Sequence, residues 1–190
     1  MCGNNVTNMY STYSNCRNLT GSPVCGDNVT SMAHAYQGCC NLTGSPVCGN
    51  NVISMWDAYY NCSNLTGSPV CGKKVTDMHS TYNNCSNLTG SPVCGESVTS
   101  MAHAYARCYN LNGSPVCGNN VINMEGMFML LDSVKIDGLI NLETSNVSNI
   151  RYMFAFGSYD NLDLRGMDLS NVMNIDYMFY VVNLSIRRNF

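Results

Sequence analysis

Cysteine is the residue type whose number and spacing in this sequence are most suggestive of chemistry. The 190-residue chain contains twelve cysteines, and all except Cys40 fall into two columns that recur every 23 residues. Thiols in register can be buried structural side chains, accessible nucleophiles, disulfide partners or metal ligands. The first column consists of Cys16, Cys39, Cys62, Cys85 and Cys108, and the second of Cys2, Cys25, Cys48, Cys71, Cys94 and Cys117.

The first column is expected to be buried. A later unit places Leu131 where the earlier units have Cys16 and its copies. A position that accepts a plain hydrophobic side chain does not need a reactive thiol, and unpaired cysteine is among the residue types most often buried. The sequence therefore predicts that these five cysteines are inert core thiols.

The second column is expected to face solvent. The later units place Glu143, Arg165 or Asp168 at this position, and Ile140 in one unit, depending on how they are aligned. Three of the four residues are charged, which predicts an accessible stripe of thiols. The stripe consists of Cys25, Cys48, Cys71, Cys94 and Cys117.

Three interpretations of this stripe are open: free thiols in a reducing compartment, disulfides between neighbouring units, and a ladder of metal sites. A Cα separation of about 5 Å between stacked units is within the range that a disulfide spans, although parallel side chains make its torsion angle awkward. The sequence lacks the CxxC pairs typical of zinc sites, and its histidines are out of register with the cysteines. We therefore predict no metal site and no cofactor.

The histidines do not indicate catalysis. His34 and His103 share one position in the duplicated segment MAHAY, and His79 comes one position earlier in its unit. None has a cysteine or serine partner in a motif typical of nucleophilic catalysis. No pair of carboxylates recurs at a fixed spacing, and TGSPVCG is not a phosphate-binding fingerprint. We expect solvated histidines on helices, no catalytic residue and no enzymatic activity.

The polar surface offers a different kind of candidate site. Asn, Ser, Thr, Gly and Tyr dominate where charges normally lie, which suits many weak, identical contacts with protein or glycan partners. Trp56 stands where other units have Tyr10 or His79, so we expect these three side chains on a candidate binding face. The alternative interpretation is a soluble coat without a ligand.

The elements that must position these residues are set by the repeat itself. Within one unit, the apolar residues from Val29 to Cys39 fall at i, i+3, i+7 and i+10, which is one face of a short helix. Leu19-x-x-Ser22-x-Val24, closed by Gly26, predicts a short extended segment. Such a unit cannot bury its apolar face alone. The pattern therefore predicts an α/β repeat solenoid of about eight coils, each a short parallel strand plus a short helix.

The repeats divide the sequence into two regions of one domain. Residues 1–118 hold near-identical 23-residue units, in which NLTGSPVCG is copied almost unchanged. Residues 119–190 hold divergent units of 25–26 residues, in which the segments 146–154 and 171–179 match residues 120–128. We expect both regions to form a single continuous stack.

Two segments of the divergent region resemble a known family. NVSNIRYMF (146–154) and LDLRGMDLSNVMNIDYMF (162–179) are similar to the repeats of BspA-like leucine-rich-repeat surface proteins. Leu19-x-x-Ser22-x-Val24 followed by Val29-x-x-Met32 also looks like a leucine-rich repeat with serine at one leucine position. The resemblance implies a leucine-rich-repeat-like solenoid at a microbial cell surface or secreted, often linked to adhesion, without catalytic residues.

Charge and hydropathy disfavour two classes of partner. Charged residues make up 11% of the chain, and the net charge is −3. No run of Lys and Arg indicates nucleic acid, and no apolar run is long enough to insert into a membrane. The first ten residues, MCGNNVTNMY, lack the regions of a signal peptide and begin within a repeat. This start predicts a fragment, a processed product or an abrupt first coil.

Two functional hypotheses follow. The first is a surface binding or adhesion module for protein or glycan partners. The alternative is a structural spacer or fibre segment, in a virion or a cell-surface array, whose uncapped terminal coils associate end to end. Solenoids normally carry polar caps, and the first residues of this chain do not look like one.

Overall fold

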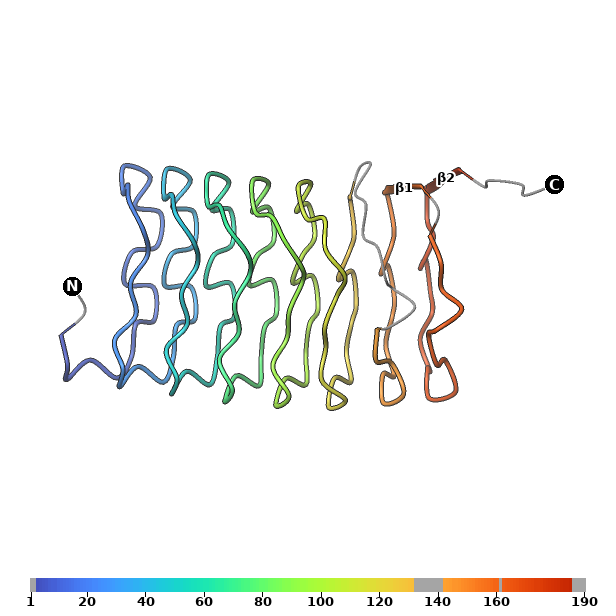
Figure 1. The fold of residues 1–190 in the computed structure, drawn as a ribbon, viewed down its shortest axis with the longest axis horizontal. Helices are drawn as coiled ribbons and strands as arrows, with labels where there is room; N and C mark the ends of the chain where they lie inside the picture. Colours follow the sequence, from blue (N-terminus) through green and yellow to red (C-terminus); the bar gives the residue numbers. More distant parts are fainter. Residues whose placement is uncertain (1–2, 132–141, 161, 186–190) are drawn as a thin grey trace.

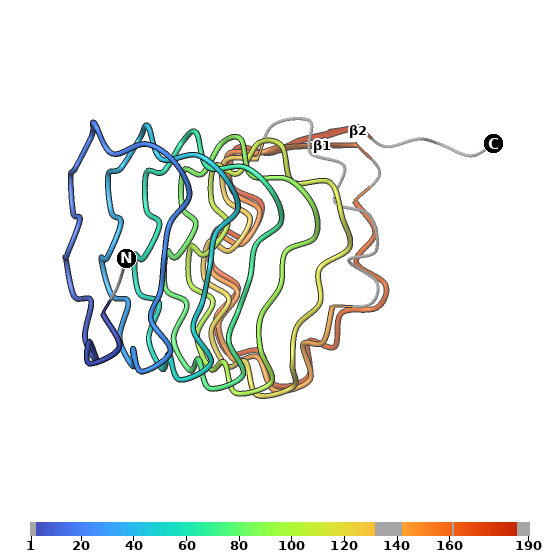
Figure 2. The ribbon, with the colours of Figure 1, turned by 60° about the vertical axis from the view of Figure 1, so that its left-hand side comes forward.

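The chain forms a row of stacked coils. The computed structural model describes residues 3–131, 142–160 and 162–185. Successive units lie side by side along the long axis of the molecule, from the N-terminal to the C-terminal end (Figure 1). In the turned view, each coil has a closed outline that repeats with little change in shape (Figure 2).

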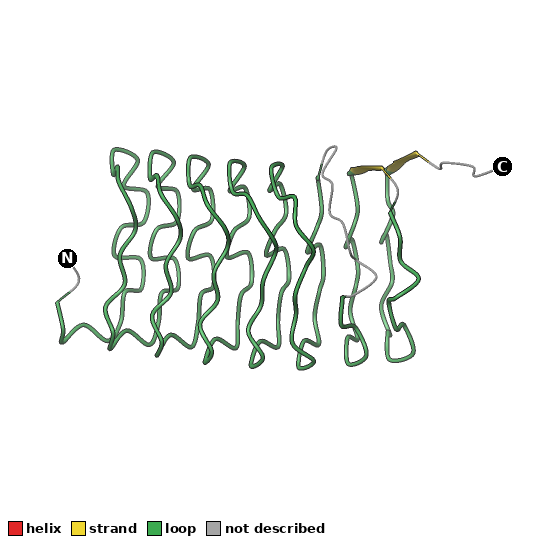
Figure 3. Ribbon diagram, viewed as in Figure 1, coloured by secondary structure: helices red, strands yellow, loops and turns green. Residues whose placement is uncertain are grey.

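The predicted α/β fold class, with a strand and a helix in every coil, is wrong. The described residues form two short strands, β1 (Ser158–Asp160) and β2 (Asn183–Ser185), and no helix (Figure 3). The two strands pair in parallel, with Tyr159 opposite Leu184. In this part of the chain there is consequently no helix that could cross a membrane. The segment 19–24, expected to be extended, is not a strand.

Backbone hydrogen bonds between coils replace the expected helix. The N–H groups of alternate residues donate to carbonyls of the next coil, as Met9 does to Ser31 at 2.9 Å and Tyr13 to Ala35 at 2.8 Å. The residues between them donate to carbonyls three positions earlier in their own coil. Every second N–H is therefore unavailable for the i→i−4 bonds that define an α-helix. The same set of bonds recurs down to Phe156 N–H, which donates to the next coil.

Two positions in each coil adopt left-handed backbone conformations, with φ between 49° and 73°. Such values favour Gly, Asn, Asp and His over bulky residues. These left-handed residues change the direction of the chain between successive turns. As a result, the side chains that a helix would point inward also point inward here. The first position is Ser11, His34, Asp57, Ser80, His103, Gly126, Tyr152 and Tyr177. The second is Asn15, Gly38, Asn61, Asn84, Arg107, Leu130, Phe156 and Val181.

Identical side chains fill the core in ladders. The Tyr36 and Tyr59 rings stack at 5.6 Å with their planes 2° apart, and the column continues through Phe128 and Phe154. Tyr36 Oη donates to the Val24 carbonyl at 2.7 Å and accepts the Val24 N–H at 2.9 Å. The buried hydroxyl thus satisfies both polar groups of a backbone segment that has no strand partner.

Candidate binding face and cysteine columns

Five aromatic side chains form a continuous row across successive coils. We call this set, Tyr10, His34, Trp56, His79 and His103, the aromatic row. Neighbouring ring centroids are 5.3, 4.8, 6.2 and 5.9 Å apart in that order. Tyr10 is 60% exposed and Trp56 44%, so the row is open to solvent at its start and centre. The arrangement presents rings from five coils on one face.

Two adjacent backbone positions supply the row. Tyr10, Trp56 and His79 occupy the position before the first left-handed residue of their coils. His34 and His103 occupy the left-handed position itself, with φ of 55° and 54°. Rings that differ by one position in the repeat therefore meet across coils. The next coil has a glycine, Gly126, where any Cβ would lie 2.3 Å from His103 Nδ1.

Carboxylates lie along the same face. Asp57 Oδ2 is 3.4 Å from His34 Nδ1, and Asp77 Oδ1 accepts the backbone N–H of His79 at 2.9 Å. Burial raises the pKa of Asp57, and the nearby His34 and His79 oppose this shift. Burial lowers the pKa of His103, which favours its neutral form. The row therefore combines imidazole and indole rings with negative charge.

A shallow hollow opens beside Trp56. It has a volume of about 480 Å³ and is lined by Trp56, Asp77, His79, Thr99 and Ser100. Its walls offer an indole face, an imidazole, a carboxylate and two hydroxyl-bearing residues. This combination can hold a small group that is flat or charged and that donates hydrogen bonds.

The structure brings together the three side chains that the sequence placed on a binding face. Tyr10 and Trp56 are separated by the ring of His34, and Trp56 contacts His79 directly. The histidines are not the solvated helix residues that we expected, because His34 and His103 complete the row and no helix is present among the described residues. The sequence held a signal for this row: its five rings follow one another at intervals of 22–24 residues, so a search that allowed one residue on either side of the 23-residue period would have found them.

Two coils beyond the row, the same face holds a cationic side chain of the protein itself. The Arg151 guanidinium carbon lies 4.7 Å from the Tyr152 ring centroid and 5.8 Å from that of Tyr177. Its Nη1 is 3.9 Å from Glu125 Oε1, and Asn149 Nδ2 donates to the other oxygen of Glu125 at 3.0 Å. We call these five residues the Arg151 cluster. They show the face holding a guanidinium group between aromatic rings and a carboxylate.

The first cysteine column belongs to the core, except at its first member. Cys16 is exposed in the first coil, and its four copies are buried. Each buried thiol donates to a tyrosine carbonyl in the preceding coil at 3.0 Å, as Cys39 does to Tyr13. Burial raises the pKa of Cys39 to about 11 and raises that of Cys62 further. These sulfur atoms act as weak hydrogen-bond donors rather than as nucleophiles.

The second column is less accessible than the sequence indicated. Cys94 is buried, and Cys25, Cys48, Cys71 and Cys117 are half-buried. A close glycine explains this for three of them, because a Cβ on Gly72 would lie 2.9 Å from Cys48 Sγ of the preceding coil, and Gly49 and Gly95 lie in the same way against Cys25 and Cys71. The sulfur atoms of Cys25, Cys48 and Cys71 thus pack over a glycine of the next coil, so the charged residues of the longer, later units were a poor guide.

Burial also governs the chemistry of this column. It raises the pKa of Cys48 to about 12 and that of Cys71 to about 11, so both are protonated at neutral pH. Cys48, Cys71, Cys94 and Cys117 are not joined in disulfides. Among the residues that the structure describes, no group of three or more His, Cys, Asp and Glu side chains could hold a metal ion.

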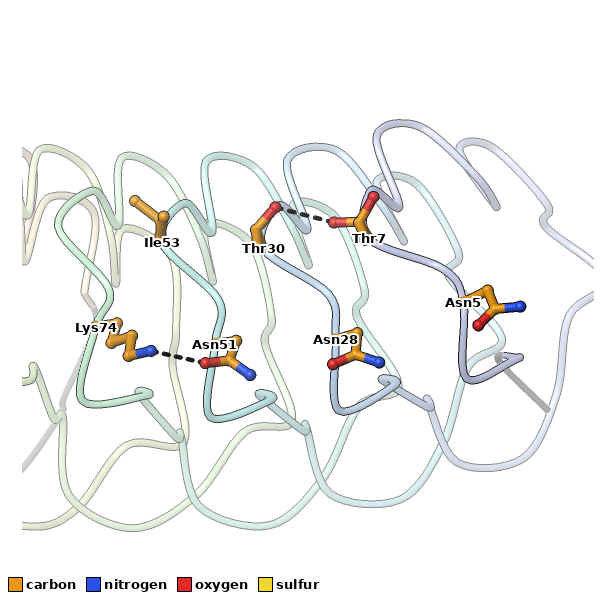
Figure 4. Close-up of a pocket in the computed structure, with 7 residues that line it drawn as sticks. All are labelled: Asn5, Thr7, Asn28, Thr30, Asn51, Ile53 and Lys74. Carbon is orange, nitrogen blue, oxygen red and sulfur yellow. Dashed lines mark hydrogen bonds between the residues drawn. The ribbon is translucent and has the colours of Figure 1, made fainter.

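A ladder of amides and hydroxyls joins successive coils (Figure 4). Asn51 Nδ2 donates to the Asp27 carbonyl at 2.9 Å, and Thr30 Oγ1 donates to the Thr7 carbonyl at 3.0 Å. Lys74 Nζ donates to Asn51 Oδ1 at 2.7 Å. Much of the polarity that suggested a ligand-binding face therefore joins one coil to the next, which leaves fewer donors for a partner.

Comparison with known proteins gives one match. Residues 99–185 match the model of a family described as Mycoplasma protein of unknown function, DUF285. No curated protein and no solved structure matches the chain. The matched segment contains both stretches on which the resemblance to BspA-like repeats rests, 146–154 and 162–179, and it includes His103 and the Arg151 cluster. The chain is thus similar to DUF285 over a little under half of its length.

Proposed function

We propose that this chain is a non-enzymatic binding or adhesion module that acts at a cell surface or outside the cell. Its contact surface is the aromatic row, and its partners are proteins or glycans. The observation that carries the proposal is the continuous set of ring contacts from Tyr10 to His103. The resemblance of residues 146–154 and 162–179 to BspA-like surface repeats supports the location.

The physical chemistry of the row supports a role in binding. Tyr and Trp are enriched among the residues that contribute most to interfaces, since their rings bury much apolar area and keep a polar end. Rings held by their neighbours lose little side-chain freedom on association, which lowers the entropic cost of binding. His34 fixes one side of the Trp56 ring at a centroid distance of 4.8 Å, and His79 lies on the other.

The cysteines support a non-enzymatic role. A nucleophilic cysteine needs a depressed pKa and access to solvent. The pKa of Cys48 is raised to about 12, and Cys85 and Cys108 are buried and donate to backbone carbonyls. These thiols stabilise the stack of coils, and the proposal assigns them no reaction.

The test is a binding assay with a matched pair of aromatic variants. The immobilised 190-residue chain is screened against extracellular-matrix proteins and a glycan array. Trp56→Ala should weaken any interaction about tenfold or more, the usual scale for an interface aromatic. Tyr109→Ala is the control, because Tyr109 is 40% exposed and lies outside the row. Equal losses in the two variants, or no ligand at all, would count against the proposal.

The edges of the stack favour a second candidate function, end-to-end association into a structural array. In the segment of each coil equivalent to residues 9–15, alternate N–H groups donate toward the C-terminal end and carbonyls face the N-terminal end, whereas the N–H groups of Thr30 and its copies donate in the opposite direction. The N–H of Ile175 and Phe179 occupy donor positions of the last described coil, as those of Ile150 and Phe154 do one coil earlier. The carbonyls of Asn8 and Thr12 take the matching acceptor positions in the first coil. Only head-to-tail contacts join these two edges, which is the geometry of filaments.

Packing at the C-terminal edge supports the same idea. Ile175 is 52% exposed and Phe179 is 41% exposed, although Ile150 and Phe154 are fully buried. Sedimentation velocity over a range of concentrations should show growing assemblies, and Ile175→Glu should abolish them. Ile53→Glu is the control at a site 49% exposed within the stack. A monomer at every concentration would exclude this second function and leave the first untouched.

A further inference from the structure

We propose that the hollow beside Trp56 binds the guanidinium or ammonium group of an Arg or Lys side chain on a protein partner. The inference rests on the proposed binding function and names the class of ligand. Its occupant would lie against the Trp56 indole and pair with the Asp77 carboxylate, both of which line the hollow together with His79.

The Arg151 cluster provides the internal precedent. Arg151 occupies the same position of its coil as Trp56 and His79 occupy in theirs. Its guanidinium lies 4.7 Å from the Tyr152 ring centroid and 3.9 Å from a Glu125 oxygen. The hollow presents the same two partners, an aromatic ring and a carboxylate. At Arg151 the cationic group belongs to the chain itself. Beside Trp56 the cationic group would come from a partner.

Charge along the face favours a cation over a neutral guest. Asp57, Asp77 and Glu125 lie on or beside the aromatic row and its continuation, and the residues that form the row and line the hollow include no Lys or Arg. A cation in this position gains from each carboxylate, whereas a neutral sugar gains only from hydrogen bonds. The chain as a whole carries a net charge of −3, which attracts basic partners from a distance.

The geometry of the hollow also prepares it for a cation. Trp is the aromatic residue that binds cations best, and partial desolvation strengthens the interaction. The His79 N–H holds Asp77 Oδ1 at 2.9 Å, which fixes the carboxylate before a ligand arrives. The guest would pair with Oδ2. Thr99 and Ser100, the latter paired with Asp77 across the coils, add hydroxyl groups to the lining, which can accept further N–H donors.

The sequence provides a direct reporter, since Trp56 is the single tryptophan of the chain. Its fluorescence is titrated at physiological salt with an acetylated hexa-arginine peptide. A hexa-citrulline peptide of the same length serves as the matched probe, because citrulline keeps the planar shape and removes the charge. We expect hexa-arginine to change the emission with saturation and hexa-citrulline to leave it unchanged. Equal responses to both peptides would overturn the inference.

Two charge-neutralising variants separate a specific site from general attraction. Asp77→Asn keeps an oxygen for the His79 N–H and removes the charge, so it should weaken hexa-arginine binding about fivefold or more. Asp163→Asn makes the same change in net charge at an exposed carboxylate outside the row, which is ionised because Arg165 lowers its pKa to about 2. It should leave binding unchanged. Equal weakening in both variants would show attraction by net charge only and would overturn the inference.

A third titration distinguishes failure of this inference from failure of the proposed function. A neutral trisaccharide of N-acetylglucosamine is added to the same protein. A saturable response to the sugar, with none to hexa-arginine, would overturn the cationic ligand while leaving a binding role for the row. If neither probe changes the emission and the array of matrix proteins and glycans is also silent, both proposals fail.

Discussion

Cys62 Sγ donates its hydrogen to the backbone carbonyl of Tyr36, 3.0 Å away and one coil earlier. The same bond joins Cys85 to Tyr59 and Cys108 to Tyr82. A repeated thiol therefore serves the stack as a small hydrophobic side chain that also gives a carbonyl its second hydrogen bond, beside the backbone N–H that the Tyr36 carbonyl accepts from Cys39 at 3.1 Å. This dual role explains a cysteine column without invoking a disulfide, a metal or a nucleophile.

The first prediction concerns that bond. Cys62→Ala removes a fully buried sulfur and one hydrogen bond to the Tyr36 carbonyl, which keeps the bond from Cys39 N–H at 3.1 Å, so it should lower the free energy of unfolding by about 1–3 kcal/mol. Cys16→Ala is the matched control, because Cys16 is exposed in the first coil and should cost less than about 0.5 kcal/mol. Urea unfolding followed by circular dichroism gives both values. Similar costs at the two sites would refute a structural role for the buried thiol.

The second prediction concerns the buried tyrosine hydroxyls. Tyr59 Oη donates to the Val47 carbonyl at 2.7 Å and accepts the Val47 N–H at 3.0 Å. Tyr59→Phe keeps the ring stack and strands both backbone groups, which should destabilise the protein by about 1–3 kcal/mol. Tyr109→Phe, at an exposed ring, should change the stability by less than about 0.5 kcal/mol. Thermal and urea unfolding of the two variants provide the comparison.

The third prediction is a loss of stability in alkali. Burial raises the pKa of Cys39 and Cys71 to about 11 and that of Cys48 to about 12, and it raises the pKa of Tyr59 as well. A folded-state pKa above the unfolded value means that the unfolded chain releases its protons first as the pH rises. The stabilisation is therefore complete below about pH 8 and is lost progressively between about pH 9 and 12.

Urea midpoints measured at pH 7, 9, 10 and 11 check this expectation. The midpoint should fall steadily above pH 9, and Tyr59→Phe should show a shallower fall because one buried phenol is gone. A midpoint that stays level from pH 7 to 11 would contradict the assignment of these groups to the core. Reductant is kept in every sample so that oxidation of the thiols does not contribute.

The inward face of each coil was predictable, and the backbone that presents it was not. Val29, Met32, Tyr36 and Cys39 are buried, and their spacing identified them. The spacing i, i+3, i+7 is produced by a helix, and equally by two turns with left-handed residues between them. The hydrogen-bond partners decide between these, and those partners lie in the next coil. Asn15 and Gly38, at one column of the repeat, were the residue types that indicated the turns.

The aromatic row shows a similar limit. Trp56 and Tyr10 were identifiable as candidates because they differ from their counterparts in other coils. His34 could not be joined to them from the 23-residue period, since its ring comes from the neighbouring position and reaches Trp56 only across the stack. Such contacts depend on the offset between coils, which the hydrogen bonds between turns determine.

The last prediction concerns the glycine after each cysteine of the second column. A Cβ at Gly72 would lie 2.9 Å from Cys48 Sγ and 3.0 Å from the Gly49 carbonyl oxygen, so Gly72→Ala should destabilise the stack by about 1–3 kcal/mol. Adding Cys48→Ala removes the sulfur but not the backbone oxygen, and we expect a partial rescue. Gly3→Ala is the control, because a Cβ there meets no atom within 4 Å and the change should be neutral. Gly21 is unsuitable, because its φ of +85° would strain any side chain. If the double variant loses as much unfolding free energy as the two single variants lose together, the sulfur and the glycine do not pack against each other.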